Sequence, residues 1–293
     1  MLLTDIEFHE ASTLKEASEW MGRYAPYARL MAGGTDLLVD LKTHRIGTAH
    51  VVSINRIAAL RGLTTTNGSL RIGALTTATD LLNSTMIWER FPGIVDAVKD
   101  LAVLQIRNMA TIGGNIAGAV PSGDMPPILV VLHATVNLWS VSGEREVPLE
   151  DFFTGPRQTV RRPDEVLTEI RVPYPPPRFG AAYVPFALRE ANGCSVASAA
   201  ASLLLDERNT IRDARICLGA VAPTPKFAKT VNASLVGKAA EAATFRKAAE
   251  EAKEVALPIS DVRGSADYRR ELIGILTNRA LHSARARAVG GAQ

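Results

Sequence analysis

The sequence has 293 residues, of which 47% are hydrophobic and 22% charged, so it predicts two or three globular domains and not a disordered chain. Its formal net charge of +3 is too small to indicate a nucleic-acid partner. The longest apolar runs fall well short of the ~20 residues that a membrane span needs, and the first residues show no export signal.

The first third of the chain predicts helices and strands that alternate around a glycine pair. Thr13 and Glu16 have the spacing of a capping box at the start of a helix. The expected elements are a helix, a strand, a helix and a strand over residues 13 to 22, 29 to 32, 36 to 43 and 50 to 54. Gly33 and Gly34 separate the first strand from the second helix, and strand, glycine turn and helix is the order that an anion site needs.

The middle third predicts an α+β domain around a second glycine pair. Strands are expected over residues 70 to 74, 128 to 132, 135 to 141 and 166 to 172, and helices over residues 77 to 82 and 91 to 104. The second and third of these strands are expected to form a hairpin. Gly113 and Gly114 follow the helices, and because they lack a Cβ they can take positive φ and bring their N–H groups to a ligand.

A proline-rich segment marks the predicted domain boundary. Residues 172 to 180 read VPYPPPRFG, and four prolines in nine residues cannot continue a helix or a central strand. The expected elements beyond it are three strands and two helices, over residues 181 to 189, 195 to 206, 210 to 221, 239 to 255 and 265 to 286. The second of these strands is rich in small residues, which indicates close packing against it.

The two glycine pairs stand 80 residues apart, in MAGGTDLLV at 31 to 39 and ATIGGNIAGAVPSGDMPP at 110 to 127. Two such loops facing each other could hold a pyrophosphate through their N–H groups. Two ordinary glycine turns are the alternative that these residues leave open. No GxGxxG motif occurs, which argues against a Rossmann-type nucleotide site.

The chain resembles the FAD-binding (medium) subunit of molybdenum hydroxylases, the family of xanthine and carbon monoxide dehydrogenases. Three motifs carry this resemblance: GGTDL, then TIGGN with an aspartate shortly after it, and ARICLGAVAPTP at 214 to 225. The likeness covers nearly the whole chain. It implies an α+β fold with a two-part FAD-binding domain of the vanillyl-alcohol-oxidase (PCMH) type, at residues 1 to 55 and 56 to 177. It also implies a C-terminal domain of a three-stranded antiparallel sheet plus helices, at residues 178 to 293.

The resemblance also implies which residues hold the cofactor. Those that would surround the pyrophosphate and nearby ribityl oxygens are Ala32, Gly33, Gly34, Thr35, Asp36, Thr111, Ile112, Gly113, Gly114 and Asn115. Asp124 would accept hydrogen bonds on the flavin side, and Leu101 and Leu167 would touch the adenine or the ring. From the residues alone, the alternative for Asp124 is a turn aspartate, and the alternative for the two leucines is a place in the core.

The region that follows the proline-rich segment matches the region that borders the isoalloxazine in relatives. The residues concerned are Tyr183, Phe186 and Arg189. Some relatives carry a lysine close to where this chain has Pro185, so the outer edge of the ring is not specified by the match. The alternative for Arg189 is a surface ion pair.

The function implied by the resemblance is electron transfer by an oxidoreductase subunit. FAD would be noncovalent, because neither glycine loop contains a histidine or cysteine to tether it. Electrons would come from a small [2Fe-2S] subunit, substrate oxidation would occur at the molybdenum cofactor of a large molybdopterin subunit, and NAD or a quinone would accept the electrons. The assembly would be a dimer of heterotrimers, a heterohexamer, in the cytoplasm, and no catalytic acid, base or nucleophile is expected in this chain.

Two other functions remain open from the sequence. A free-standing FAD-dependent oxidase or reductase would have the same fold but its own substrate pocket. A noncatalytic nucleotide-binding module would use the glycine loops without a redox cofactor. Neither the substrate of the complex nor the identity of the electron acceptor can be read from these residues.

No metal site is predicted within the chain. The five histidines are scattered without an HExxH motif, and Cys194 and Cys217 match no zinc or iron–sulfur spacing. The segment between Asn115 and Pro127 contains no cysteine, so no additional [4Fe-4S] cluster is expected there. This sparse cysteine content is typical of a reduced, cytoplasmic protein.

Overall fold

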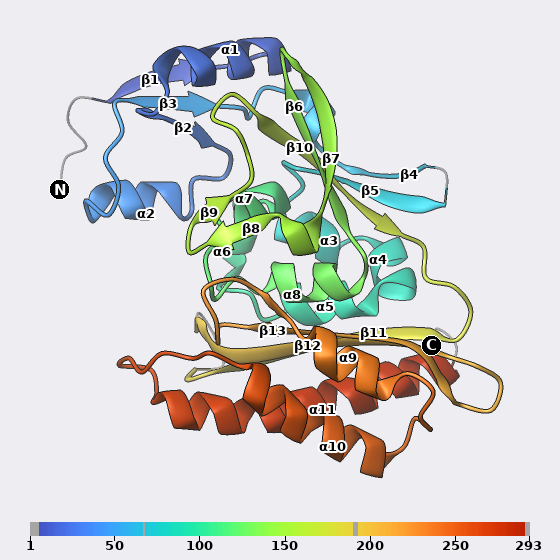
Figure 1. Cartoon of the computed structure of the whole chain (residues 1–293). Helices are drawn as coiled ribbons and strands as arrows, with labels where there is room; N and C mark the ends of the chain where they lie inside the picture. The colour runs from blue at the N-terminus through green and yellow to red at the C-terminus, as the bar shows by residue number, and fades with distance from the viewer. Residues whose placement is uncertain (1–5, 67, 190–192, 291–293) are drawn as a thin grey trace.

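Three sheets follow one another along the chain in the computed structural model, which describes residues 6 to 66, 68 to 189 and 193 to 290 (Figure 1). A small parallel sheet lies at the top of this view. A five-stranded sheet with a group of short helices lies in the middle. A four-stranded sheet covered by the last helices lies at the bottom.

The first sheet is parallel, in the order β1-β3-β2. Its elements are β1 (Glu7–Glu10), α1 (Leu14–Tyr24), β2 (Ala28–Met31), α2 (Leu37–Lys42) and β3 (His50–Ser53). Thr13 caps α1 by accepting from the backbone N–H of Glu16 at 3.1 Å, while Glu16 accepts from the backbone N–H of Ser12 and not from Thr13. The four elements predicted for this region are confirmed as α1, β2, α2 and β3. The structure adds β1, which the sequence did not predict.

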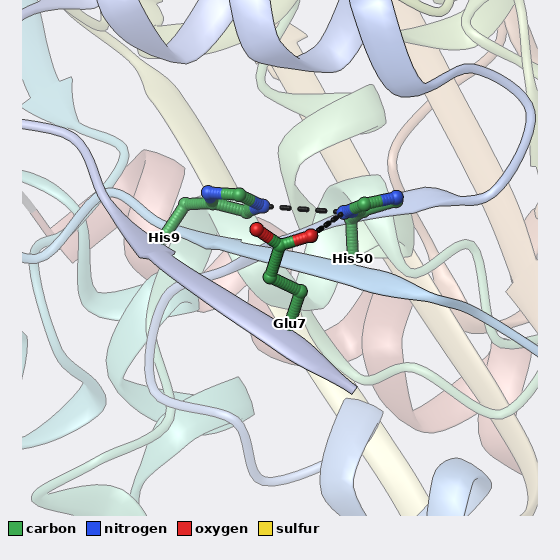
Figure 2. Close-up of side chains that lie close together, drawn as sticks. All are labelled: Glu7, His9 and His50. Atoms are coloured by element: carbon green, nitrogen blue, oxygen red, sulfur yellow. Dashed lines mark hydrogen bonds and ion pairs between the residues drawn. The ribbon is translucent and has the colours of Figure 1, made fainter. Parts of the chain in front are cut away.

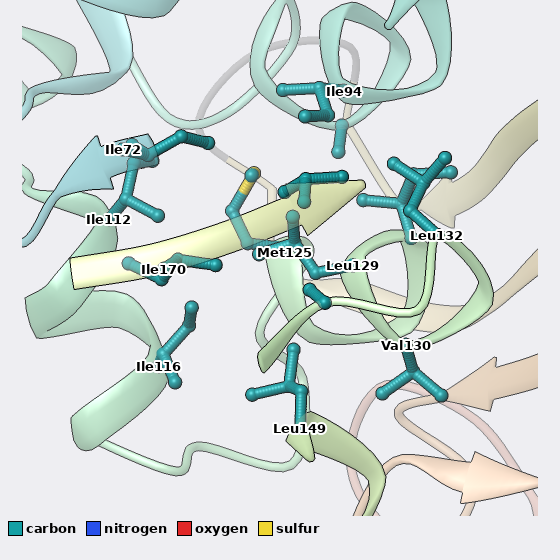
Figure 3. Packing of buried hydrophobic residues seen from close by; sticks show 14 of the residues in the cluster. Ile72, Ile94, Ile112, Ile116, Met125, Leu129, Val130, Leu132, Leu149 and Ile170 are labelled. Carbon is teal, nitrogen blue, oxygen red and sulfur yellow. The ribbon is translucent and has the colours of Figure 1, made fainter. Parts of the chain in front are cut away.

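The second sheet is antiparallel, in the order β4-β5-β10-β6-β7. Its strands are β4 (Leu63–Thr66), β5 (Ser69–Gly73), β6 (Thr135–Ser140), β7 (Gly143–Pro148) and β10 (Val166–Pro173), and a small ribbon pairs β8 (Phe153–Gly155) with β9 (Gln158–Thr159). The helices beside it are α3 (Ala78–Leu82), α4 (Thr85–Arg90), α5 (Pro92–Val98), α6 (Leu104–Arg107), α7 (Ile112–Ala117) and α8 (Met125–Val131), with single 3-10 turns at Ala58–Leu60 and Leu149–Asp151. The core between them packs α7 and α8 against β10 (Figure 3).

The predicted strand at 128 to 132 is wrong, because these residues lie in helix α8. All seven residues of α8 are buried, and Figure 3 shows Met125 and Leu129 near Ile170 of β10. A short helix that is apolar on every side has no 3.6-residue pattern, so its sequence cannot be distinguished from a buried strand. The predicted strand at 135 to 141 is confirmed as β6, and its hairpin partner is β7.

The single helix predicted over residues 91 to 104 is also wrong. The chain forms α5 and α6 instead, and Ala102 between them has a φ of 46°, which no α-helix contains. This break leaves the segment before α6 free to line a cavity beside α5, described below.

The third sheet is antiparallel, in the order β11-β12-β13-β14. Its elements are β11 (Phe179–Ala187), β12 (Ser195–Leu205), β13 (Ile211–Gly219), β14 (Lys226–Phe227), α9 (Lys229–Leu235), α10 (Ala242–Val255) and α11 (Ala266–Gly290). The three predicted strands and two predicted helices are present, and the structure adds the two-residue β14 and α9.

The small residues of β12 lie between two layers, as their pattern predicted. On one face, the hydroxyl of Ser202 donates to the carbonyl of Val131 in α8 at 2.9 Å. On the other face, α11 crosses β11 so closely that a Cβ on Gly180 would lie 2.1 Å from the carbonyl oxygen of Ala284. The third sheet is therefore the shared wall between the helices of the middle layer and the C-terminal helices.

Within the described ranges, no helix combines the length and the apolar character needed to cross a membrane.

One buried arginine ties the start of α11 to the third sheet. Arg269 is 1% exposed and donates to the carbonyls of Val196 and Ala220, each at 3.1 Å, and to Asp261 at 2.6 Å. Hydrogen bonds from Arg263, and then from Arg269, hold the pKa of Asp261 well below its usual range. A single side chain thus satisfies acceptors from three segments.

We expect Arg269→Met to lower the free energy of unfolding by about 1 to 3 kcal/mol, because it leaves buried carbonyl oxygens without a donor. Chemical denaturation monitored by circular dichroism measures this change. Arg270→Met is the matched control. Among the described residues, Arg270 pairs with the exposed Asp267 three residues earlier, and such pairs contribute less than about 1 kcal/mol. Equal losses in the two variants would contradict this assignment.

Candidate functional site

A cavity of about 320 Å³ opens where strands β2 and β3 end. Ligands of parallel sheets bind beyond the carboxyl ends of the strands, and this cavity has that position. The predicted site residues that line it are Ala32, Gly33, Gly34, Thr35, Asp36, Thr111, Gly113, Gly114, Asn115 and Leu167. The structure therefore brings both glycine segments to one cavity, whereas Ile112 points away into the core between α7 and β10.

The first glycine loop keeps its backbone donors available. Gly34 has a φ of 73°, and the chain turns there between β2 and α2. The backbone N–H groups of residues 33 to 37 donate to no acceptor among the described residues. A run of unpaired N–H groups facing a cavity is an arrangement that binds phosphate oxygens.

The second glycine segment differs from the expectation. Gly113 and Gly114 have no positive φ and lie in α7, where their N–H groups donate to the Ala74 carbonyl at 2.9 Å and to the Thr111 hydroxyl at 3.1 Å. Those donors are satisfied within the protein. The glycine at 113 is needed for packing, because a Cβ there would lie 2.6 Å from the Cβ of Ala74.

Asn115 supplies the second segment's unsatisfied polar atom. Its Oδ1 is buried and has no hydrogen-bond partner among the described residues, and Asn115 lines the cavity. A buried acceptor without a donor costs about 1 to 3 kcal/mol, so such an atom in a cavity indicates a ligand group that completes it. A polyhydroxy ligand with a phosphate group fits both this acceptor and the free donors of the first loop.

Three arginines that the sequence did not single out line the same cavity: Arg29, Arg157 and Arg161. Arg157 binds the buried carboxylate of Asp40 in α2, and Arg161 donates to the backbone carbonyl of Glu165 at 2.6 Å. Burial lowers the pKa of Arg161 although Glu165 opposes this, and the guanidinium stays charged near neutral pH. In the sequence, Arg157 and Arg161 stand in a short segment before β10 that also contains Arg162, and this clustering of arginines is the signal that could have found them.

Carboxylates balance these cations within the cavity. Asp36 lines it beside Asp40, and burial raises the pKa of Asp36, with Arg157 opposing the shift. Asp40 accepts from Arg45 at 2.5 Å as well as from Arg157, so it orients both guanidinium groups. Asp40 therefore holds the guanidinium of Arg157 at a fixed position beside the cavity, where it can attract an anion.

A second cavity, of about 470 Å³, lies between α5, β11 and the start of β12. Leu101, Asp124 and Arg189 line it, so the structure separates these three predicted residues from the glycine segments. Tyr183 and Phe186 line it too, as expected for the region after the proline-rich segment. The chain from Asn115 to Asp124 runs from the first cavity to the second.

Asp124 does not act as a turn or cap residue. It precedes α8, but its side chain makes no hydrogen bond to the N–H groups of that helix. Its Oδ1 instead accepts from the Tyr183 hydroxyl and the Ser195 hydroxyl, both at 2.6 Å. Burial raises the pKa of Asp124, with the hydrogen bonds from Ser195 and Tyr183 opposing the shift. The carboxyl joins the middle layer to β11 and β12 at the wall of the second cavity.

Comparison with known proteins gives matches over nearly the whole chain. The family described as the FAD binding domain in molybdopterin dehydrogenase matches residues 4–175, and the CO dehydrogenase flavoprotein C-terminal domain matches residues 182–284. The carbon monoxide dehydrogenase medium chain of Hydrogenophaga pseudoflava is 34% identical over 287 residues, covering 98% of this chain and 99% of that one. The xanthine dehydrogenase FAD-binding subunit of Escherichia coli O157:H7 is 33% identical over 98% of each chain.

A solved structure has the same fold. Carbon monoxide dehydrogenase from Hydrogenophaga pseudoflava superimposes with a TM-score of 0.94 at 34% identity, over 98% of this chain and 99% of that chain. The predicted α+β class, with an FAD-binding part followed by a C-terminal part, is confirmed.

The contact between the two glycine segments can be tested at Gly33. A Cβ at this position would lie 1.7 Å from the carbonyl oxygen of Met109, a backbone atom that cannot move without displacing the second segment. We expect Gly33→Ala to lower the free energy of unfolding by about 1 to 3 kcal/mol and to reduce the FAD content of the purified protein. Denaturant titration and flavin absorbance measure the two effects.

Gly47→Ala is the matched control, because a Cβ at Gly47 would meet nothing within 4 Å and its φ is not in the left-handed region. It should be neutral or slightly stabilising. If Gly33→Ala behaves like this control, the two segments are not in the contact described here.

Proposed function

This chain belongs to the family of FAD-binding subunits of molybdenum hydroxylase-type complexes, and we propose that it passes electrons through FAD from a small [2Fe-2S] subunit to an external acceptor such as NAD or a quinone. It is an FAD-binding oxidoreductase component. The observation that carries the proposed site is the pairing of unsatisfied backbone donors at residues 33 to 37 with the orphaned Oδ1 of Asn115 around one cavity.

In this proposal the first cavity holds the pyrophosphate and the ribityl chain. The free N–H groups of residues 33 to 37 donate to phosphate oxygens, and Arg157 and Arg161 offset the negative charge of the phosphates. Asn115 Oδ1 accepts from a ribityl hydroxyl. Thr111 contributes by capping α7, and Gly113 contributes by letting α7 approach β5, so their effect on the cofactor is through position.

The second cavity is proposed to border the flavin ring. Leu101 provides an apolar wall, Arg189 adds a cationic group to the cavity lining, and Asp124 holds the Tyr183 and Ser195 hydroxyls in fixed positions. Leu167 is the apolar contact within the first cavity. When bound, FAD supplies the electron-transfer chemistry, and the residues of this chain bind it, orient it and set its electrostatic surroundings.

The proposed assembly is a dimer of heterotrimers in the cytoplasm, with a large molybdopterin subunit that oxidises substrate at its molybdenum cofactor. The proposed domains are residues 1 to 55, 56 to 177 and 178 to 293, and the three successive sheets support this division. Cys194 and Cys217 are both unpaired, which supports a reducing compartment. The relatives of this chain include subunits of both a carbon monoxide and a xanthine dehydrogenase, at 34% and 33% identity, so the match names no substrate.

We expect Asn115→Ala to weaken FAD binding by about 1 to 3 kcal/mol, because it removes an acceptor that only the ligand completes. Titration of the apoprotein with FAD, followed by flavin fluorescence, measures the dissociation constant. Asn108→Ala is the control, since Asn108 is exposed, accepts from Thr79 and lines neither cavity. An unchanged dissociation constant in Asn115→Ala would remove this residue from the site.

The direction of electron flow can be tested by mixing the FAD-loaded chain anaerobically with the prereduced [2Fe-2S] subunit. We expect the visible flavin absorbance to bleach and then to recover when an acceptor is added. Substrate turnover by the isolated chain would favour a free-standing oxidase or reductase. A purified chain that binds nucleotides but never flavin would favour a noncatalytic module.

A further inference from the structure

A cluster of potential metal ligands lies on the face of the first sheet that α1 covers. Glu7 and His9 stand two residues apart on β1, so their side chains point to the same face. Parallel pairing places His50 of β3 beside Glu7. Figure 2 shows the three side chains pointing toward one another. Within the part of the chain that the structure describes, Glu7, His9 and His50 form the one group of three His, Cys, Asp or Glu residues whose ligand atoms come close enough together to hold a metal ion.

Two of the three distances in the cluster match those of a tetrahedral metal centre. His9 Nε2 lies 3.2 Å from His50 Nδ1, and His50 Nδ1 lies 3.3 Å from Glu7 Oε2. Zinc bonds to nitrogen and oxygen are about 2.0 to 2.1 Å long, so neighbouring ligands of a tetrahedral site are separated by about 3.3 Å. The third separation, between the ligand atoms of Glu7 and His9, is within 4.8 Å. Three protein ligands leave the fourth position of a tetrahedral centre for water.

Hydrogen bonding alone satisfies this cluster poorly. His50 Nδ1 has two close neighbours, the nitrogen of His9 and the carboxylate oxygen of Glu7. If this nitrogen carries a proton, both neighbours compete for it, and if it does not, its lone pair faces the carboxylate. A cation between the three atoms would accept all three lone pairs at once. We propose that Glu7, His9 and His50 bind a divalent transition-metal ion of the zinc class.

Aromatic packing holds the two imidazoles in place. The Tyr24 ring stacks on His50 with centroids 3.9 Å apart and on His9 with centroids 5.1 Å apart, and Trp20 lies 5.3 Å from His9. Both aromatic residues come from α1, so the helix fixes the ligand rings from one side. Glu7 has a side chain that is 64% exposed, which gives the ion a route from solvent.

The cluster is separate from the proposed FAD site. Glu7 and His50 are the first residues of β1 and β3, whereas the first cavity opens at the other ends of β2 and β3. A strand of four residues, at a rise of about 3.3 Å per residue, places these ends about 10 Å apart. The ion would clamp the edge strand β1 to the central strand β3 without contacting the cofactor.

The test uses the full chain, stripped of metal with a chelator and then dialysed against Zn²⁺. We expect one bound zinc per chain and a higher midpoint of thermal unfolding when zinc is present, since an ion that binds only the folded state stabilises it. Glu7→Gln, His9→Gln and His50→Gln should each weaken zinc binding by at least about 10- to 100-fold, because changes even behind a metal ligand have that effect. Glu7→Gln is the sharpest variant, since this exposed side chain has little packing to lose.

Two control variants separate this site from adventitious binding. His44→Asn removes an exposed histidine outside the cluster, and Cys194→Ser removes an exposed thiol, so both should bind zinc normally. FAD content checks that each variant is folded. The proposal is wrong if the unaltered chain binds no zinc, or if all three cluster variants retain its affinity while a control variant loses it.

Discussion

The close backbone contact between the two glycine segments is the constraint on which the proposed cofactor site depends. Gly33 lies directly against the carbonyl of Met109, and Gly113 lies against Ala74 at the end of β5. These approaches bring the small parallel sheet and the five-stranded sheet together around one cavity. Any side chain at either glycine would separate the layers, because the opposing atoms belong largely to the backbone.

The two segments contribute to the cavity in different ways. The first provides unpaired backbone donors, whereas the second uses its donors internally and provides the unpaired acceptor of Asn115. Arginines from β2 and from the loop before β10 add charge, and Asp40 holds two arginine side chains in fixed positions. Preorganised groups of this kind can neutralise a pyrophosphate without a metal ion or a mobile lysine.

The third sheet completes the proposed site, because residues of β11 and β12 line the second cavity. Asp124 receives hydrogen bonds from β11 and β12, so the wall of the second cavity depends on how the C-terminal sheet packs on α8. Arg287 reinforces the same junction, since it binds Asp96 of α5 at 2.6 and 3.0 Å. The proposed ring site thus lies where two layers meet, while the proposed metal cluster stiffens the far end of the first sheet.

The sequence by itself determined the local features: the capped first helix, both glycine pairs, the proline-rich segment that ends β10 and the long C-terminal helices. Each of these rests on residues close together in the chain. It could not determine α8, because a fully buried helix has no periodic pattern. Nor could it join Arg157 to Asp40, or His9 to His50, 41 residues away. Such contacts arise only when packing brings distant segments together, and the tertiary structure alone decided them.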